Sequence, residues 1–305
     1  MELGFIGLGR MGGNMVARLL AGRSIRVVVH DRSEEPVKAL VAKGALAAGS
    51  PTQLVSMLGA SPRVVWLMLP AGEVTEVIYR EVREQLGEGD ILVDGANSNH
   101  RDTSRRALEC AARGIRLLGV GVSGGIVAAD SGYPMMIGGD PAAYAHCLPL
   151  FQGLGLDKGY ALVGSDPSAG HYVKMVHNAI EYGMMQAIAE GFDLLQNGSV
   201  KGLDLPGIAG IWNHGTIVSS FLMQMTANAL ARDADLSGLA PFVADSGEGR
   251  WAAIEAMEHS VPFVANTYAL HARYQSRDPN SLALRLLSAM RREFGGHAVK
   301  PAGTD

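Results

Sequence analysis

The chain has 305 residues, which is more than a single domain usually holds and enough to bury a substantial core. Its 26 Lys and Arg and its 30 Asp and Glu are interspersed and give a net charge of -4, which excludes the basic surface typical of proteins that bind nucleic acids or anionic membranes. Two cysteines are too few for a disulfide framework, and no apolar run reaches the roughly 18 residues of a membrane span.

The amino terminus enters a short apolar strand, Glu2–Ile6, without the basic and then apolar segment of a secretory signal. We therefore expect a cytoplasmic protein with a small-molecule ligand. The strand is followed at once by Gly-Leu-Gly-Arg-Met-Gly and then by a helical pattern. This order predicts a dinucleotide-binding turn, in which backbone N–H groups and the helix dipole hold a pyrophosphate. The alternative is a plain strand-turn-helix corner. We assign the turn to Gly7, Gly9, Met11 and Gly12.

The second predicted strand, residues 25–31, ends in Asp31, about 20 residues beyond the last glycine of the turn. A carboxylate at this position accepts hydrogen bonds from a ribose hydroxyl and repels a 2′-phosphate. Arg32 follows directly and would face a 2′-phosphate if Asp31 turned away. The sequence therefore favours NAD as the cofactor and leaves NADP open.

Further apolar runs recur along the first half of the chain at 64–69, 90–94, 116–122, 134–137 and 160–163. Strands of this kind, without strict alternation, are covered on both faces and indicate a mostly parallel, doubly wound sheet. Ligands bind beyond the carboxyl ends of such strands. We expect Pro70 and Gly72 to shape a loop near the nicotinamide, and we count Leu69, Pro70 and Asn97 among the cofactor-binding residues. We expect Asn97 and the turn Ser123-Gly124-Gly125 to bind substrate as well. Each could equally be an ordinary turn residue.

Beyond residue 164 the strand patterns give way to amphipathic helices. We predict an α/β protein: a doubly wound Rossmann domain over 1–164, followed by an all-helical domain for substrate binding and oligomerisation over 165–305. Helices are expected at 171–197, 206–213, 216–231, 240–244, 249–258, 262–275 and 279–293.

The first of these helices has two contrasting faces. Apolar residues recur on one face at steps of three and four and form a stripe predicted to be buried: Val173, Val176, Ile180, Met184 and Ala187. At about 100° per residue, the opposite face gathers a base, an acid and two hydrogen-bonding groups: Lys174, His177, Asn178 and Glu181. We place the chemistry on this polar face. The alternative is a solvated face with ordinary pairs between neighbouring turns.

Six segments carry further motifs: the glycine-rich turn through Asn14, residues 94–103, Gly121-Val-Ser-Gly-Gly125, residues 171–182, Gly247-Glu-Gly-Arg-Trp251 and Phe294-Gly-Gly-His297. Together they resemble the decarboxylating 6-phosphogluconate dehydrogenases, in their short form, over nearly the whole chain. The segment 171–182 is the most specific, because related hydroxyacid dehydrogenases share its lysine and asparagine but not the whole run.

The resemblance implies oxidative decarboxylation of 6-phosphogluconate to ribulose 5-phosphate with reduction of NAD(P), without a metal. It implies that Lys174 is the base and Glu181 the acid. It also implies that the substrate is contacted by Asn97, Ser123, Gly124, Gly125, His177, Asn178 and Tyr182, and its phosphate by Arg273. Arg291 and His297 match residues that reach the active site of the neighbouring subunit, which implies a homodimer or homotetramer.

Two positions depart from the family's pattern. Ser246 stands where the long-form members have a phosphate-binding lysine, and residues 126–130 differ from the usual bulky or acidic residues. Two other functions therefore stay open. One is a β-hydroxyacid dehydrogenase that does not decarboxylate, such as one acting on 3-hydroxyisobutyrate, and the other is a non-catalytic NAD(P)-sensing protein.

Overall fold

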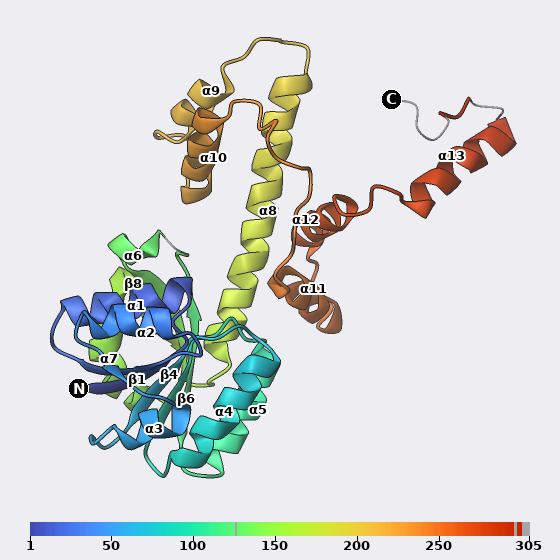
Figure 1. The fold of residues 1–305 in the computed structure, drawn as a ribbon. Coiled ribbons are helices and arrows are strands. Elements are labelled where there is room, and N and C mark those ends of the chain that lie inside the picture. The colour runs from blue at the N-terminus through green and yellow to red at the C-terminus, as the bar shows by residue number, and fades with distance from the viewer. Residues whose placement is uncertain (126, 296–297, 301–305) are drawn as a thin grey trace. The chain divides into compact units, whose positions relative to one another are not determined.

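The computed structural model describes residues 1–125, 127–295 and 298–300 of the chain (Figure 1). The fold divides into two compact units, the first covering Met1–Asn178 and the second starting at Ala179. Helix α8, Ala169–Asn197, belongs to both units, because the division falls inside it.

The first unit contains one eight-stranded sheet with the order β3-β2-β1-β4-β5-β6-β7-β8. Neighbouring strands are parallel except β6 and β7, which are antiparallel. The strands are β1 Glu2–Ile6, β2 Arg26–His30, β3 Leu46–Ala47, β4 Val64–Leu67, β5 Ile91–Asp94, β6 Arg116–Val122, β7 Tyr133–Gly139 and β8 Gly155–Gly164. This arrangement confirms the predicted doubly wound α/β fold.

Helices cover both faces of the sheet, as the continuous apolar strands predicted. One buried cluster joins the strands to α1 Arg10–Ala21, α2 Glu34–Val41 and α7 Pro141–Leu154. A second cluster joins them to α3 Pro51–Ser56, α4 Glu73–Gln85 and α5 His100–Ala111. A short helix, α6 Ala128–Ser131, precedes β7.

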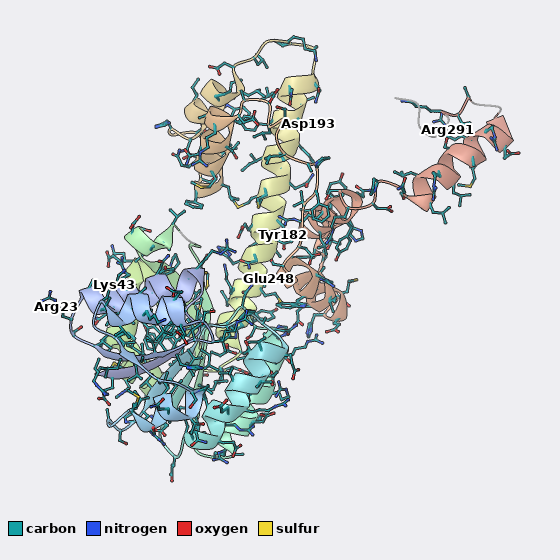
Figure 2. The ribbon with its side chains drawn as sticks, in the orientation of Figure 1. Arg23, Lys43, Tyr182, Asp193, Glu248 and Arg291 are labelled. Atoms are coloured by element: carbon teal, nitrogen blue, oxygen red, sulfur yellow. The ribbon has the colours of Figure 1, made fainter. Side chains whose placement is uncertain are left out.

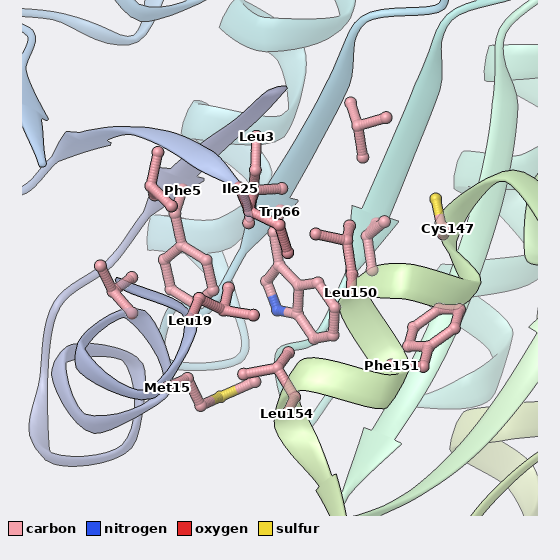
Figure 3. Packing of buried hydrophobic residues seen from close by; sticks show 14 of the residues in the cluster. Leu3, Phe5, Met15, Leu19, Ile25, Trp66, Cys147, Leu150, Phe151 and Leu154 are labelled. Carbon is pink, nitrogen blue, oxygen red and sulfur yellow. The ribbon is translucent and has the colours of Figure 1, made fainter. Parts of the chain in front are cut away.

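Trp66 of β4 lies at the centre of the first cluster (Figure 3). Its ring stacks on Phe5 with centroids 5.9 Å apart and meets Phe151 edge-on at 6.2 Å. Cys110 and Cys147 are both buried and free. The aromatic contacts anchor β1, β4 and α7 to one another on the face opposite α4 and α5.

Helix α8 begins in direct backbone contact with the sheet. A Cβ atom on Gly170 would lie closer than 3.0 Å to the carbonyl oxygens of Gly119 in β6 and Met136 in β7. A Cβ on Gly121 would meet the side chain of Lys174 in the same way. Only glycine permits this approach, so the first turns of α8 are fixed against the strands that precede the Ser123 turn.

The predicted burial of the apolar stripe on α8 is wrong. Val173, Ile180 and Met184 are 37%, 48% and 42% exposed, whereas Lys174 and Asn178 are only 8% and 9% exposed. The reason is that α8 turns its polar face toward its neighbours, where Ser123 supplies a hydrogen-bonding partner. Periodicity located the two faces correctly but did not reveal which one is covered.

The second unit is helical, as predicted. Its elements after α8 are α9 Leu205–Trp212, α10 Phe221–Arg232, α11 Glu248–Glu258, α12 Val264–Gln275 and α13 Leu282–Gly295. The expected helix at 240–244 is absent: the segment has no regular structure, contains Pro241 and closely follows Gly238. Helix α10 starts later than the predicted residue 216, because the Ser220 side chain caps it by accepting a hydrogen bond from the Met223 N–H at 3.1 Å.

Small apolar clusters hold the helices of the second unit together. One contains Phe192, Leu205, Ala209, Met223 and Leu230, and the other contains Tyr182, Ala253, Ala269 and Leu270. Helix α13 keeps its apolar residues in solvent instead, at 44% to 71% exposure: Leu282, Leu284, Leu286, Leu287 and Met290. In the part of the chain that the structure describes, no helix is long and apolar enough to cross a membrane.

The glycine contact at the start of α8 leads to a prediction about stability. Gly170→Ala should destabilise the protein by about 1–3 kcal/mol or more, because the added methyl group overlaps two backbone oxygens that cannot move independently. Gly191→Ala in the same helix is the matched control, since nothing lies within 4 Å of its added Cβ. It should be neutral or stabilising by up to about 1 kcal/mol. Urea denaturation of both variants checks this, and equal midpoints would contradict the packing argument.

Candidate active site

The glycine-rich turn lies between β1 and α1. Gly7 has φ +99, and a Cβ on it would overlap the Met68 carbonyl, while a Cβ on Gly12 would overlap the carbonyl of Gly7. Gly9 differs, because nothing lies within 4 Å of its Cβ position and it is exposed. Helix α1 has no acidic residue in its first turn. The turn thus offers open backbone and an unopposed helix dipole to an anion. Met11 is part-buried against the core, so its backbone faces the turn and its side chain does not.

Asp31 follows the end of β2 and is bound to this turn. Its Oδ2 accepts a hydrogen bond from the Leu8 N–H at 2.6 Å, and its Oδ1 accepts one from the Ser33 N–H at 2.8 Å. Each carboxylate oxygen keeps further acceptor capacity. Asp31 is half-buried and Arg32 is exposed. The carboxylate is therefore held at the turn, while the guanidinium is not fixed in the direction that a 2′-phosphate would require.

The loop after β4 carries Leu69 and Pro70. Leu69 packs against the cluster on the α3, α4 and α5 side, and Pro70 is exposed. The Pro70 carbonyl accepts a hydrogen bond from the Thr75 hydroxyl at 2.8 Å, which ties the loop to α4. Gly72, with φ +103, completes the turn into α4. These contacts support a shaping role for the loop and bring no reactive group to it.

Lys174 and Ser123 are brought together by the fold. The Lys174 Nζ donates a hydrogen bond to the Ser123 Oγ at 3.1 Å, although 51 residues separate them in sequence. Ser123 directly follows β6, and the next two residues have positive φ, +96 at Gly124 and +56 at Gly125. A Cβ on Gly124 would overlap Ala128. The turn therefore presents a hydroxyl and backbone N–H groups beside a mostly buried amine.

Two of the other predicted residues lie one turn further along α8. The His177 Nδ1 and the Asn178 Oδ1 are 3.0 Å apart, and Asn178 is buried while His177 is part-buried. Asn178 follows Lys174 by four residues, so the two side chains share one face of the helix. This group of amine, imidazole and amide lies wholly within the first unit.

Sequence reasoning gave no role to His171, which is buried one turn before Lys174. Its Nδ1 lies 2.7 Å from the Oγ1 of Thr103 in α5. Burial lowers the pKa of His171 below its usual value, so the imidazole is neutral near pH 7. The available signal was the position of His171 on the same helical face as Lys174 and Asn178. The contact joins α5 to the helix that carries the amine.

Asn97 is exposed in the turn between β5 and α5. Beneath it, Asp94 and Ser98 are buried and hydrogen-bonded, with Ser98 Oγ 3.1 Å from Asp94 Oδ2. The Asp94 carboxylate also binds the buried Arg106 of α5 at 2.6 Å. Arg106 was not among the predicted residues. Its signal was the spacing of Thr103, Arg106 and Cys110, which places a charged residue within the buried stripe of α5.

In the second unit, Tyr182 is the centre of a polar cluster. Its hydroxyl lies 3.1 Å from the Ser246 Oγ and accepts a hydrogen bond from the Ser246 N–H at 3.0 Å. The Arg273 guanidinium lies 3.5 Å above the tyrosine ring and donates to the Ala244 carbonyl at 2.8 Å. Figure 2 labels Tyr182 on α8 together with Glu248 on α11, in the helix that begins at this cluster. Two predicted substrate contacts, Tyr182 and Arg273, thus lie beside Ser246, which departs from the family's pattern.

Asp245 forms ion pairs with two arginines near Arg273 but not with Arg273 itself. Its carboxylate accepts hydrogen bonds from Arg250 at 3.1 Å and from Arg277 at 3.0 Å. Burial alone would raise the pKa of Asp245, but the two arginines and the Gly247 N–H together outweigh burial and hold the pKa below its usual range. Across residues 1–125, 127–295 and 298–300, no carboxylate pairs with Arg273. Its charge is therefore available to an anion.

The side chains of two predicted residues, Glu181 and Arg291, have no hydrogen bond or ion pair among the residues that the structure describes. Glu181 is part-buried on α8, in the second unit, seven residues after Lys174. Arg291 is exposed on α13, as Figure 2 shows, and His297 lies outside the described residues. Within the described ranges, no three His, Cys, Asp or Glu side chains are grouped as metal ligands.

Comparison with known proteins decides the family. Residues 2–164 match the model of the NAD-binding domain of 6-phosphogluconate dehydrogenase, and residues 170–283 match the model of its C-terminal domain. The chain belongs to the 6-phosphogluconate dehydrogenase family. It therefore carries the family's NAD(P)-binding domain and its helical C-terminal domain.

Relatives of the same length are found in this family. A putative 6-phosphogluconate dehydrogenase of Bacillus subtilis is 36% identical over 300 residues, covering 98% of this chain and 99% of that protein. An NAD(+)-dependent, decarboxylating 6-phosphogluconate dehydrogenase of Haloferax volcanii is 39% identical over 302 residues, with 98% of each chain covered. A solved 6-phosphogluconate dehydrogenase of Plasmodium falciparum has a TM-score of 0.83 and 28% identity, covering all of this chain and 67% of that one.

The buried imidazole of His171 predicts a pH effect on stability. Because the folded protein holds the pKa of His171 below its value in the unfolded chain, near 6.5, unfolding takes up a proton below that pH. The free energy of unfolding should fall on this account by up to about 1.4 kcal/mol per pH unit below pH 6.5.

His171→Gln removes the titrating group and should lose less stability than the wild type between pH 7.5 and pH 5.5. The control is His259→Gln, which removes a side chain that is 65% exposed. Urea unfolding at the two pH values measures the difference. The same pH dependence in the wild type and in His171→Gln would contradict the prediction.

Proposed function

We propose that this protein catalyses the oxidative decarboxylation of 6-phosphogluconate to ribulose 5-phosphate and CO₂, with NAD as the preferred acceptor. The observation that carries the proposal is the hydrogen bond of the mostly buried Lys174 amine to Ser123, beyond the carboxyl end of β6. Family membership supports the same activity, since the Haloferax relative of equal length bears the name of a decarboxylating, NAD(+)-dependent enzyme.

The residues present fit a bound dinucleotide. Gly7, Gly9, Met11 and Gly12 would hold the pyrophosphate through their backbone, and Gly9 has open space where a side chain would otherwise stand. Leu69, Pro70 and Asn97 would border the nicotinamide. When bound, the cofactor supplies the acceptor for the hydride released from C3 of the substrate. Asp31 would accept hydrogen bonds from the ribose hydroxyls and repel a 2′-phosphate. If NADP were the cofactor, Arg32 would face its 2′-phosphate.

Lys174 is the proposed base for the C3 hydroxyl. An amine abstracts a proton only when it is neutral, and removal from water together with nearby positive charge favours the neutral form. Neutral Lys174 takes the hydroxyl proton as the hydride leaves C3, which forms a β-keto acid. The ketone then accepts the electron pair of the breaking bond to CO₂. Protonated Lys174 donates to the ketone oxygen, and an enediol remains. Ser123 holds the amine at this position.

Glu181 is the proposed acid for the last step. It is two turns beyond Lys174, which places it on the same helical face, about 10 Å further along the axis. In its protonated form it would deliver a proton to the carbon that lost CO₂, and this carbon becomes C1 of ribulose 5-phosphate. Contacts from Asn97, Gly124, Gly125, His177 and Asn178 would orient the carboxylate and the polyol chain.

Arg273 is the proposed partner of the substrate phosphate. Support comes from its charge, which has no carboxylate partner among the described residues and is held in place by stacking on Tyr182. The Tyr182 and Ser246 hydroxyls would add hydrogen bonds to the same phosphate. Ser246, in place of the lysine of the long-form members, leaves one cation fewer here, so phosphate binding would depend more on Arg250, Arg273 and Arg291.

The proposed enzyme is a homodimer or a homotetramer. Helix α13 supports this, because five of its apolar residues are exposed at 44% or more in the single chain and would be covered by a second copy. Arg291 lies on the same helix and would reach the neighbouring active site together with His297. A site completed by two chains would account for an arginine with a binding role on a helix whose apolar residues are so exposed in the single chain.

The function is tested by initial rates with 6-phosphogluconate and each cofactor. NAD should give the higher kcat/KM, because Asp31 opposes a 2′-phosphate. The comparison substrate is 3-hydroxyisobutyrate, which lacks the phosphate and the polyol chain. Turnover of 3-hydroxyisobutyrate without turnover of 6-phosphogluconate would overturn the proposed reaction, and preference for NADP would overturn the assignment of Asp31.

The base and the shared site are tested together by two variants. Lys174→Ala should lower kcat by 10²–10⁴-fold while leaving NAD binding intact, as expected for loss of an acid-base group. Arg291→Ala should raise the KM for 6-phosphogluconate and lower turnover. Lys43→Ala, which changes an exposed lysine, serves as the control and should behave as the wild type.

Mixing the two impaired variants after partial denaturation gives the sharper result. In a mixed dimer, one site has a wild-type Lys174 and receives a wild-type Arg291 from the other chain. Random reassociation should then restore about a quarter of the wild-type activity. No recovery in mixtures shown to contain mixed dimers would rule out a contribution of Arg291 across chains.

A further inference from the structure

The turn that carries Asn97 is built over a buried cation. Arg106 of α5 is 1% exposed. Its Nη1 donates to the Asp94 Oδ2 at 2.6 Å and to the Ser98 Oγ at 3.0 Å. Asp94 is the last residue of β5, and Ser98 directly follows Asn97. A single guanidinium therefore holds the turn on both sides of the exposed amide.

The rest of the guanidinium is bound as well. Its Nε and Nη2 donate to the Glu76 Oε1 in α4, at 2.9 and 2.5 Å. Within the turn, the Ala96 N–H donates to the Asp94 Oδ1 at 3.1 Å. The Arg106 side chain thus links α4, α5 and the end of β5, and its planar fork fixes the angle between two carboxylates.

Stability does not explain this arrangement. A buried ion pair costs desolvation energy that its attraction barely repays, and apolar residues of similar volume are often as stable or more stable. The neighbouring positions of the buried stripe hold Thr103 and Cys110, which shows that smaller, uncharged side chains pack on this face of α5. What an apolar residue at 106 could not supply is a directional contact to Asp94 and Ser98.

We propose that Arg106 is a positioning residue for Asn97, which it orients by holding Asp94 and Ser98 in one fixed arrangement. The inference rests on the proposed function, because that function assigns Asn97 to the substrate and the nicotinamide. Arg106 does not touch either ligand and acts only through the turn.

Arg105 provides a matched control from the adjacent position. It binds the same Glu76 oxygen at 2.6 Å and also binds Glu109 at 2.8 Å, but it is 42% exposed. Its ion pairs involve Glu76, Asp102 and Glu109, none of which belongs to the turn. A change at Arg105 therefore removes a similar ion pair with α4 and leaves the contacts to Asp94 and Ser98 in place.

The test is a double-mutant cycle with Asn97→Ala, using the full-length protein and kcat/KM for 6-phosphogluconate. Arg106→Lys keeps the charge and loses the fork, and it should lower kcat/KM by about 10-fold or more in the wild-type background. In the Asn97→Ala background the same change should lower kcat/KM by less than about 2-fold, because the amide that Arg106 orients has been removed. Arg105→Lys should have no such effect in either background.

Ser98→Ala is the second variant, for the case in which Arg106→Lys does not fold. It removes the hydroxyl that Arg106 binds in the turn. It should lower kcat/KM less than Arg106→Lys does, and this loss should again nearly disappear in the Asn97→Ala background. Equal losses in both backgrounds would overturn the proposal, since a merely structural effect multiplies with Asn97→Ala. A wild type without activity toward 6-phosphogluconate would overturn the proposed function and this inference together, whereas an active wild type with equal losses overturns only the role of Arg106.

Discussion

The close approach of Gly170 to the backbones of β6 and β7 is the contact on which the proposed site depends. A side chain at this glycine would overlap carbonyl oxygens of two strands, so the start of α8 has one position relative to the sheet. One turn later, Lys174 passes over Gly121 and reaches Ser123 at 3.1 Å. The amine is thereby placed beyond the carboxyl end of β6 by backbone packing, which is more rigid than a contact between long side chains.

A second constraint on α8 and on the Asn97 turn comes from helix α5. Thr103 of α5 meets the buried His171 of α8, and Arg106 of α5 meets the turn that carries Asn97. Helix α5 therefore contacts both the helix that carries Lys174 and the turn that carries Asn97. Buried polar contacts of this kind fix geometry at a cost in stability, which is typical of positions where function sets the requirement.

Much of the fold could be predicted from the sequence, because its signals are local. The order of strand, glycines, helix and acid indicated the cofactor turn, and continuous apolar runs indicated strands covered on both faces. The helix at 240–244 and the buried stripe of α8 were wrong for different reasons. The first was a five-residue segment that contains Pro241 and closely follows Gly238, and the second required knowledge of which helical face is covered. The spacing of α5 could have marked Arg106 as a charge in a buried stripe, but its partners could not be predicted, because they lie 12 and 30 residues away.

The two units divide the proposed work between them. The first holds the cofactor turn, the amine and the polar groups around it, and the second holds Tyr182, Arg273 and Glu181. The most direct test of this account is the ratio of labelled CO₂ released from 1-¹⁴C-6-phosphogluconate to reduced nicotinamide formed. The account predicts one CO₂ for each reduced cofactor in the wild type. Reduction of the cofactor by 6-phosphogluconate without release of CO₂ would contradict it.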